Sequence, residues 1–332
     1  MEPMQEPSSL DRALDEAVSL LLGAQRIGVI AHVNPDADAI GAVLGLAGGL
    51  RALGKEVYPT LNDYVPDYAR FLEASANIEP AFPVDPLDVI ICVDAADVER
   101  VGDVYLQNPE RFQSTPVLNV DHHRTNPRFG RVNYVDPTAS STSELSYRIL
   151  SHMEAPIDTD TATALLFGIV GDTGSFQNGA TTPGSLETAA ALLRCGADSQ
   201  RVAFYLFECK RFVAARLWGR VLSTIELDPR RRIVFACLSQ TELHEEGATV
   251  DETEGIAEYL RGIEDADVVM LMKETEEGSM RISMRSRPNV DVSVIATTLD
   301  GGGHRQAAGC TIPGPFAAAK ETLVNAYDRL NS

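Results

Sequence analysis

The chain has 332 residues, 44% of them hydrophobic and 23% charged, and its mean hydropathy of −0.07 is close to zero. This composition is that of an ordinary globular protein, and no apolar run approaches the ~18 residues of a membrane span. The formal net charge of −20 argues against long duplex nucleic acid as a partner, because Lys and Arg supply most of the affinity for phosphate backbones. A small phosphate substrate is compatible with this charge if divalent cations offset it.

Residues 1–7 are acidic and Pro-rich, without the basic and apolar regions of a signal peptide. Five scattered cysteines form no Cys-x-x-Cys pair, which favours reduced thiols in a cytoplasmic protein. These are Cys92, Cys195, Cys209, Cys237 and Cys310. The length of the chain favours two domains over one.

The first half of the chain alternates apolar runs with helical periodicity. This pattern predicts an α/β domain with a mainly parallel sheet and helices on both faces. Apolar runs predict strands over residues 26–33, 57–61, 88–94 and 117–121. Helices are predicted over residues 9–23, 38–53 with Asp38 as the N-cap, 66–74, 140–151 and 159–170.

From residue 185 to 221 the pattern is helical apart from a break at 195–199, which predicts a helical linker. After residue 223 the helical periodicity gives way to strands mixed with helices, and a smaller C-terminal α+β domain is predicted. Its strands are predicted at 225–227, 233–238, 267–273 and 279–285, and its helices at 251–261 and 316–330. The basic triplet at 230–232 follows Asp228-Pro229 and indicates a hairpin turn.

Four segments place metal-type ligands at the ends of apolar runs: His32-x-x-x-Asp36-x-Asp38, Asp94, Asp121-His122-His123, and Asp172. Ligands of open α/β sheets bind outside the carboxyl ends of the strands, so we expect these groups to share one edge. Bare carboxylates gathered there would repel one another, and divalent cations would relieve the repulsion. Carboxylate and imidazole donors suit Mn²⁺ or Mg²⁺. A cap, a turn or a core histidine explains each segment alone, but not their co-occurrence.

In this order, and with Asp172 read as Gly171-Asp172-Thr173-Gly174, the four segments resemble the motifs of the DHH phosphoesterases. The stretch Gly301-Gly302-Gly303-His304-x-x-Ala307-Ala308-Gly309 resembles the signature of the associated C-terminal domain. Within that family the two-domain length is similar to that of the NrnA-type oligoribonucleases, which also dephosphorylate 3′-phosphoadenosine 5′-phosphate (pAp). Two departures, Ala37 for a common Gly and Ala42 for a common Ser, remove no ligand.

The resemblance implies a domain division, a ligand set and roles for the neighbouring residues. The domains would be a catalytic metal-binding domain (1–190), a helical linker (191–215) and a substrate-binding domain (216–332). Two Mn²⁺ ions are implied, with Mg²⁺ or Co²⁺ as substitutes. The first would be held by His32, Asp36 and Asp94, and the second by Asp38, Asp94, His122 and Asp172. Asp121 would orient a ligand, His123 would face the scissile phosphate, and Arg124 would assist.

The glycines of the second domain also have a physical interpretation. Three consecutive glycines, Gly301, Gly302 and Gly303, allow backbone N–H groups to approach an anion closely. His304 adds a side-chain donor, and Arg285 can hold a phosphate bidentately. We expect this lobe to hold the 5′-phosphate of the substrate. A flexible turn at the glycines and a surface ion pair at Arg285 are the simpler alternatives.

The implied reaction is attack on phosphorus by a hydroxide that bridges the two ions, in a cleft between the domains. It would release nucleoside monophosphates from oligoribonucleotides of a few nucleotides, and AMP from pAp. Hydrolysis of cyclic di-AMP or its linear product pApA, and a family II-like pyrophosphatase activity, stay open as alternatives. A non-catalytic nucleotide sensor would require a missing ligand, and every ligand is present. The resemblance also suggests a homodimer that contacts no membrane.

Overall fold

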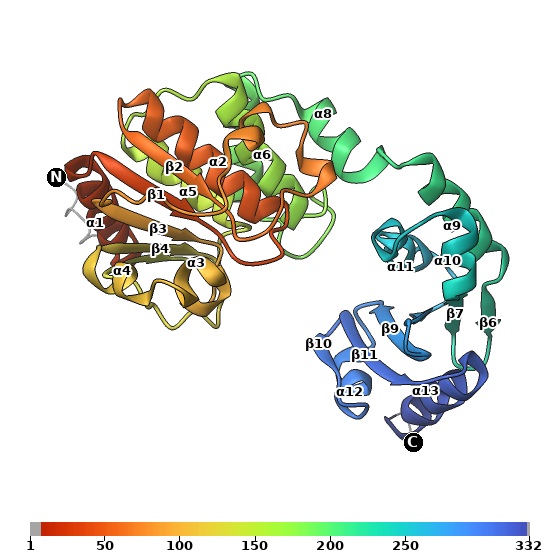
Figure 1. Cartoon of the computed structure of the whole chain (residues 1–332). Coiled ribbons are helices and arrows are strands. Elements are labelled where there is room, and N and C mark those ends of the chain that lie inside the picture. The colour runs from red at the N-terminus through yellow and green to blue at the C-terminus, as the bar shows by residue number, and fades with distance from the viewer. Residues whose placement is uncertain (1–7, 331–332) are drawn as a thin grey trace. The chain divides into compact units, whose positions relative to one another are not determined.

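The computed structural model describes residues 8–330 and divides the chain into two compact units, residues 1–209 and 210–332 (Figure 1). The boundary between these units falls within the predicted linker at 191–215. Each unit has its own sheet and its own hydrophobic core. The division into 1–190, 191–215 and 216–332 stays a prediction.

The first unit is built on a five-stranded, wholly parallel sheet with the strand order β2-β1-β3-β4-β5. The strands are β1 (Arg26–Ile30), β2 (Glu56–Thr60), β3 (Val89–Val93), β4 (Val117–Asp121) and β5 (Val132–Val135). Every residue of β3 and β4 is buried. Such continuous burial is expected where helices cover both faces of a parallel sheet.

Helices cover the two faces of this sheet unequally (Figure 1). The larger core lies under the long helices α1 (Ser9–Gly23), α2 (Ala37–Ala52), α5 (Thr142–His152) and α6 (Thr159–Asp172). A smaller core on the other face packs against α3 (Asp103–Leu106) and α4 (Pro109–Ser114). The unit ends with α7 (Pro183–Arg194) and α8 (Ser199–Ala203). The predicted α/β class with helices on both faces is therefore confirmed.

Helices α2 and α6 approach each other closely because glycines face the contact. A Cβ on Gly41 would lie 2.6 Å from the backbone oxygen of Ala164, and one on Gly168 would lie 2.8 Å from Oδ1 of Asp38. Larger residues would push the two helices apart. Asp38 and Asp172, which lie at the ends of these helices, are thereby brought to one edge of the sheet.

The structure corrects the predicted start of α2. Asp38 is not the N-cap; the cap is Asp36, whose Oδ1 accepts the backbone N–H groups of Asp38 and Ala39, both at 3.0 Å. This arrangement places Asp38 inside the first turn of the helix, where its side chain is fully buried. A cap two residues earlier leaves the second carboxylate available for another role.

The prediction of a helix over 66–74 is also wrong. The segment contains two 3₁₀ turns, Asp67–Ala69 and Glu73–Asn77, and extended backbone at Leu72 (ψ 105°) interrupts them. In contrast, α1 has the predicted bounds, and α6 continues past the predicted end to include Asp172. Strand β5 was not predicted.

The second unit contains a six-stranded mixed sheet with the order β10-β11-β9-β8-β7-β6. Only β7 and β8 are parallel; the other neighbours are antiparallel. The strands are β6 (Glu226–Asp228), β7 (Ile233–Leu238), β8 (Val268–Glu274), β9 (Ser279–Ser286), β10 (Gly302–His304) and β11 (Ala307–Pro313). Residues 230–232 form the predicted turn between β6 and β7.

Helices cover one face of this sheet fully and the other in part. One core packs α12 (Val292–Thr297) and α13 (Phe316–Leu330) against β8, β9 and β11. A second core packs α9 (Phe212–Ser223), α10 (Gln240–Glu246) and α11 (Ile256–Leu260) against β7 and β8. The predicted smaller α+β domain is confirmed.

Two helical predictions in this region need correction. The helix expected over 251–261 is broken at Gly255, which has a left-handed backbone (φ +87°) and separates a 3₁₀ turn from α11. The linker has a second break at residues 209–211, where the backbone is extended before α9 begins. Strands β10 and β11 were not predicted, because the glycines suggested a turn rather than a paired strand.

All five cysteines are free thiols, as predicted. Across residues 8–330, no helix has both the length and the apolar character needed to cross a bilayer. Residues 1–7, on which the absence of a signal peptide was argued, lie outside the described part of the chain.

Candidate metal centre

The six predicted metal ligands meet at the carboxyl-terminal edge of the parallel sheet. They come from the loop after β1, the start of α2, the residue after β3, the residue after β4 and the last residue of α6. The ligands are His32, Asp36, Asp38, Asp94, His122 and Asp172. Strand ends of a parallel sheet converge in this way, which explains how segments far apart in sequence form one cluster.

The first group of ligands surrounds one oxygen of Asp94. Nε2 of His32 lies 3.4 Å from Oδ2 of Asp94 and 3.9 Å from Oδ1 of Asp36. The other ring nitrogen of His32, Nδ1, lies 2.8 Å from the carbonyl oxygen of Val33. This contact fixes the ring and turns Nε2 toward the carboxylates, as an outer hydrogen bond does in metal sites.

The second group lies on the other side of Asp94. Nε2 of His122 is 3.5 Å from Oδ1 of Asp94 and 3.3 Å from Oδ2 of Asp172. His122, Asp172 and Asp38 each offer one ligand atom within 4.8 Å of the others. The two oxygens of Asp94 therefore face two separate groups of donors, the geometry that a bridging carboxylate requires.

Asp94 itself has an unusual backbone. Its φ of +54° is in the left-handed region, which is uncommon for residues other than glycine. The side chain is only 2% exposed, and its Oδ1 accepts a hydrogen bond from Thr142 Oγ1 at 3.1 Å. Such strained positions cluster at functional sites, and here the conformation turns the carboxylate to face both groups.

The N-terminus of α5 holds Asp38. Its two carboxylate oxygens accept the backbone N–H groups of Thr142 at 2.6 Å and Ser143 at 2.8 Å. The first turn of a helix favours negative charge, so this contact stabilises a fully buried carboxylate. Ser141 caps the helix. Ser141 and Thr142 thus begin α5, and Thr142 supports Asp38 and Asp94.

The cluster contains more carboxylates than cationic groups. Burial, and then the charge of neighbouring carboxylates, raises the pKa of Asp38 and of Asp172 well above the usual range. Burial and Asp94 also raise the pKa of Asp36. Burial acts to raise the pKa of Asp94 too, but its histidine neighbours outweigh this effect and lower it.

His32 supplies positive charge next to these carboxylates. Burial lowers its pKa, but the hydrogen bond and charge of Asp94 outweigh burial and raise the pKa to about 9. One imidazolium cannot neutralise four close carboxylates. The donor set is oxygen and imidazole nitrogen without thiolate, which suits hard divalent cations such as Mn²⁺ and Mg²⁺. The residues therefore fit a metal centre.

Asp121 lies beside the cluster, at the end of β4. It is fully buried, and its Oδ1 accepts the backbone N–H groups of His122 and His123 and lies 2.7 Å from Nδ1 of His123. Its Oδ2 accepts a hydrogen bond from Asn126 at 2.6 Å. Asp121 thus orients both histidines, while the His123 side chain stays 38% exposed.

Three supporting residues were missed by the sequence analysis. They are Asn126, Thr142 as a partner of Asp94, and Arg100. The charge of Arg100 acts on His123, whose pKa it lowers against the stronger raising effect of Asp121. The one available signal was its position, six residues after Asp94 on the same strand-to-helix connection.

Comparisons with known proteins identify the two units. Residues 26–169 match the model of the DHH family, N-terminal domain, and residues 232–332 match the DHHA1 domain. The chain is similar to the bifunctional oligoribonuclease and PAP phosphatase NrnA of Thermus thermophilus, with 35% identity over 87% of this chain and 84% of the relative. The chain belongs to the DHH family.

Two further comparisons agree with this assignment. The protein of the same name from Bacillus subtilis is 29% identical over 85% of this chain and 87% of that protein. A crystal structure of an exopolyphosphatase-related protein from Bacteroides fragilis has a TM-score of 0.86 and 24% identity, and covers 96% of both chains. This last likeness supports the fold alone. The resemblance inferred from the five motifs is confirmed, and the chain is a phosphoester hydrolase.

The predicted substrate residues of this DHH protein lie in both units. Arg124, directly after His123, is exposed. In the DHHA1 domain, Gly302 and Gly303 lie in the edge strand β10 rather than in a turn, and His304 at its end is exposed. Arg285, on β9, donates from Nε to Glu258 of α11 at 2.6 Å. The simpler alternative for Arg285, an ion pair, is thus present.

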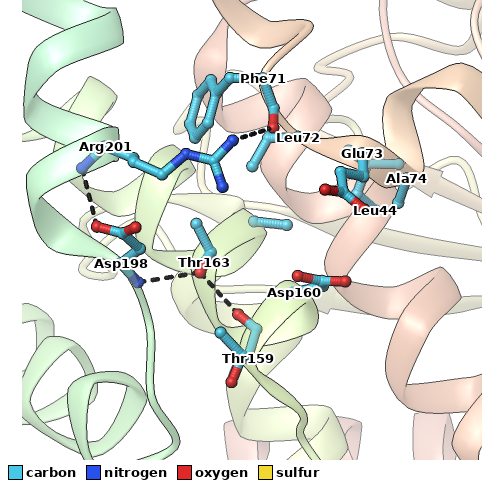
Figure 2. Close-up of a pocket in the computed structure, with 11 residues that line it drawn as sticks. Leu44, Phe71, Leu72, Glu73, Ala74, Thr159, Asp160, Thr163, Asp198 and Arg201 are labelled. Atoms are coloured by element: carbon cyan, nitrogen blue, oxygen red, sulfur yellow. Dashed lines mark hydrogen bonds between the residues drawn. The ribbon is translucent and has the colours of Figure 1, made fainter.

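The DHH unit also contains a hollow that no motif predicted (Figure 2). Two of its charged groups, Arg201 and Asp198, already have partners. Arg201 donates to the backbone oxygen of Phe71 at 3.0 Å and lies over its ring, and Asp198 accepts the backbone N–H of Arg201 at 3.0 Å. The hollow shares no residue with the ligand groups. These contacts fasten α8 to the segment 71–74.

Proposed function

We propose that this DHH protein is a Mn²⁺-dependent oligoribonuclease and pAp phosphatase. It would hydrolyse short oligoribonucleotides to nucleoside monophosphates and remove the 3′-phosphate of pAp to give AMP. Two observations support the proposal. The donor cluster fits divalent cations, and two relatives that align with most of the chain carry both activities in their names.

The observation that carries the proposal is the position of Asp94 between two donor groups. We assign His32, Asp36 and Asp94 to one Mn²⁺, and Asp38, His122 and Asp172, again with Asp94, to the other. When bound, such ions would supply Lewis-acid polarisation of the phosphate and activation of water at neutral pH. Mg²⁺ or Co²⁺ would be substitutes, since the donors are the same.

The residues around the cluster would act on the leaving group. Asp121, through its hydrogen bond at Nδ1, raises the pKa of His123. The raised pKa favours the protonated imidazole, and its Nε2 is the atom that can deliver a proton to the departing oxygen. Arg100 would bind a phosphate oxygen next to His123. Arg124, which is exposed, would assist.

The DHHA1 domain would bind the far end of the substrate. We propose that Arg285 and His304 hold the 5′-phosphate, with Gly301–Gly303 keeping the adjacent surface free of side chains. The bond cleaved would then be one nucleoside away from this phosphate. This geometry would serve pAp and a 5′-phosphorylated dinucleotide alike. Arg285 would exchange Glu258 for the substrate, because a phosphate dianion is the stronger partner.

A turnover panel tests the proposal. Purified protein with Mn²⁺ would be assayed on pAp, pApA, cyclic di-AMP and pyrophosphate, with EDTA as the metal control. We expect turnover of pAp and pApA, and loss of both with EDTA. Preference for cyclic di-AMP would favour the alternative of a cyclic-di-AMP phosphodiesterase, and turnover of pyrophosphate alone would favour the pyrophosphatase. Activity that survives metal removal would contradict the proposal.

Three organisational features belong to the same proposal. The catalytic domain would extend over residues 1–190, the linker over 191–215 and the substrate-binding domain over 216–332. The protein would act in the cytoplasm, where short RNA products arise. It would also form a homodimer, which sedimentation of the purified protein can test.

A further inference from the structure

Strand β9 presents two different faces in the DHHA1 domain. Met280, Ile282 and Met284 point into the core beneath α12 and α13. Side chains alternate along a strand, so Arg281, Ser283 and Arg285 lie on the opposite face. These last residues are exposed or half-buried. The strand therefore carries an open, polar face beside the region that α11 covers.

The strand register arranges this open face in three rows, because directly opposed residues on neighbouring strands share a face. On β9, β11 and β10 the middle row has only small side chains, whereas on β8 the buried Leu271 lies opposite Ser283. The two outer rows carry the cations and the polar groups. The first row is Arg285, Ala307 and His304; the middle row is Ser283, Gly309 and Gly302; the third row is Lys273, Arg281 and Thr311.

The third row contains two cations without an acidic partner. Lys273, opposite Arg281, donates from Nζ to Thr253 Oγ1 at 3.2 Å. Burial, and then the charge of Arg281, lowers the pKa of Lys273, while Glu258 and Glu254 act more weakly in the other direction. Among the side chains that the structure describes, neither Lys273 nor Arg281 forms an ion pair.

This arrangement differs from that of other basic residues in the same unit. Several of its arginines lie in ion pairs with carboxylates: Arg211, Arg216, Arg220, Arg231 and Arg232. In a chain with a net charge of −20, carboxylates are abundant enough to pair with two more. Adjacent like charges on a strand pair are destabilising unless an anion joins them. Positively charged surfaces bind nucleic-acid backbones in proteins that recognise single strands.

The spacing of the rows suggests which anion this is. Arg281 and Arg285 are four residues apart on β9, or ~13 Å along the strand. That is about the separation of phosphates two nucleotides apart in an extended strand, and the small middle row leaves space above it. We propose that Lys273 and Arg281 form a second phosphate site, which holds the first phosphate beyond the scissile one.

This inference rests on the proposed function, in which Arg285 holds the 5′-phosphate and the bond cleaved is one nucleoside away. The third phosphate then lies on the 3′ side of the bond cleaved. It exists in pApApA but not in pApA or pAp. The site therefore acts only on substrates of three nucleotides or more, and it extends binding toward longer oligonucleotides.

The test compares these three substrates in four proteins: the unaltered chain, Arg281→Ala, Lys273→Ala/Arg281→Ala, and Arg230→Ala. The last variant removes an exposed cation at the β6–β7 turn, so it matches the charge change elsewhere in the unit. We expect the double variant to raise KM for pApApA about tenfold, with pApA and pAp unchanged. For Arg281→Ala, the KM for pApApA should lie between those of the unaltered chain and the double variant. Arg230→Ala should leave KM for all three substrates unchanged.

Salt dependence supplies a second measurement. One further phosphate contact steepens the dependence of log(kcat/KM) on log[salt] by ~0.7 for a single strand. The unaltered chain should show this extra slope for pApApA relative to pApA, and the double variant should lose it. Equal losses on all three substrates, or no loss on pApApA, would overturn the inference.

The design separates this inference from the proposed function. If the unaltered chain fails to cleave pApA and pAp, the proposed function fails. The second site is then judged by fluorescence anisotropy of labelled pApApA and pApA in EDTA: tighter binding of pApApA that Arg281→Ala abolishes supports it, and equal binding overturns it. Arg281→Ala alters an exposed side chain, so it remains informative if the double variant does not fold.

Discussion

The candidate metal centre of the DHH domain and the open face of the DHHA1 domain carry opposite charges. The first gathers four carboxylates, of which Asp38 and Asp94 are buried, and needs cations, whereas the second gathers cations on an exposed sheet and needs anions. In the first site, backbone N–H groups hold the carboxylate of Asp38 in place. The exposed site has long side chains that can exchange partners. We therefore propose that the first site carries out the chemistry and that the second site senses the length of the substrate.

The largest expected effect is at the residue shared by both ligand groups. Asp94→Asn removes the carboxylate between His32 and His122, and we expect kcat to fall on the order of 10³-fold or more for every substrate. Asp103→Asn, an exposed acid at the start of α3, is the matched control and should retain full activity. Steady-state kinetics on pAp and pApA measure this. A loss confined to one substrate would contradict a shared metal centre.

Asp121→Asn should have a smaller effect. The variant keeps the shape but weakens the hydrogen bonds to His123 and Asn126, and residues that orient ligands typically contribute 10–100-fold. We expect kcat to fall about 30-fold and its acidic-side pH dependence to shift, since His123 loses the group that raises its pKa. A pH–rate profile measures both. Unchanged pH dependence would exclude His123 as the proton donor.

These residues also show what the sequence could predict. The predicted ligands follow buried apolar strands or lie at helix ends, so pattern alone predicts that they share one edge of the sheet. Asn126 and Arg100 escaped prediction, because their approach to His123 depends on loop geometry that no periodicity encodes. The helix expected over 66–74 failed for a similar reason, since one extended residue, Leu72, divides it.

The open face of the second domain was predictable only in part. The glycines and Arg285 were identified by motif and by chemistry. Lys273 and Arg281 were not, because nothing in the sequence says that residues eight positions apart lie opposite each other. That relation follows from the register of β8 and β9. Sites that depend on strand pairing are therefore harder to predict than sites at strand ends.

Arg285→Ala tests the substrate-binding role of the DHHA1 domain by comparing two substrates. We expect KM to rise about tenfold for pApA and little for ApA, which lacks the 5′-phosphate, with kcat nearly constant. Glu258→Gln releases Arg285 from its ion pair and should lower KM for pApA slightly. Kinetics on both dinucleotides measure these effects. An equal rise in KM for substrates with and without the terminal phosphate would contradict the role assigned to Arg285.

The smallest effect concerns stability without metal. His32 has a pKa raised to about 9, above its ordinary value of about 6.5. A raised folded-state pKa contributes stability that is present below pH ~6.5 and lost as the pH rises through ~9. In EDTA we expect Tm to fall by about 5 °C across this range. His32→Gln should reduce the fall, as should saturating Mn²⁺. A flat Tm in EDTA would contradict the charge balance described here.

The most direct test of the metal centre is anomalous diffraction at the manganese edge from crystals soaked in Mn²⁺. The account predicts two peaks ~3.5–4 Å apart, one beside His32 and Asp36 and the other beside Asp38, His122 and Asp172, with Asp94 touching both. A single peak, or peaks away from these side chains, would contradict it.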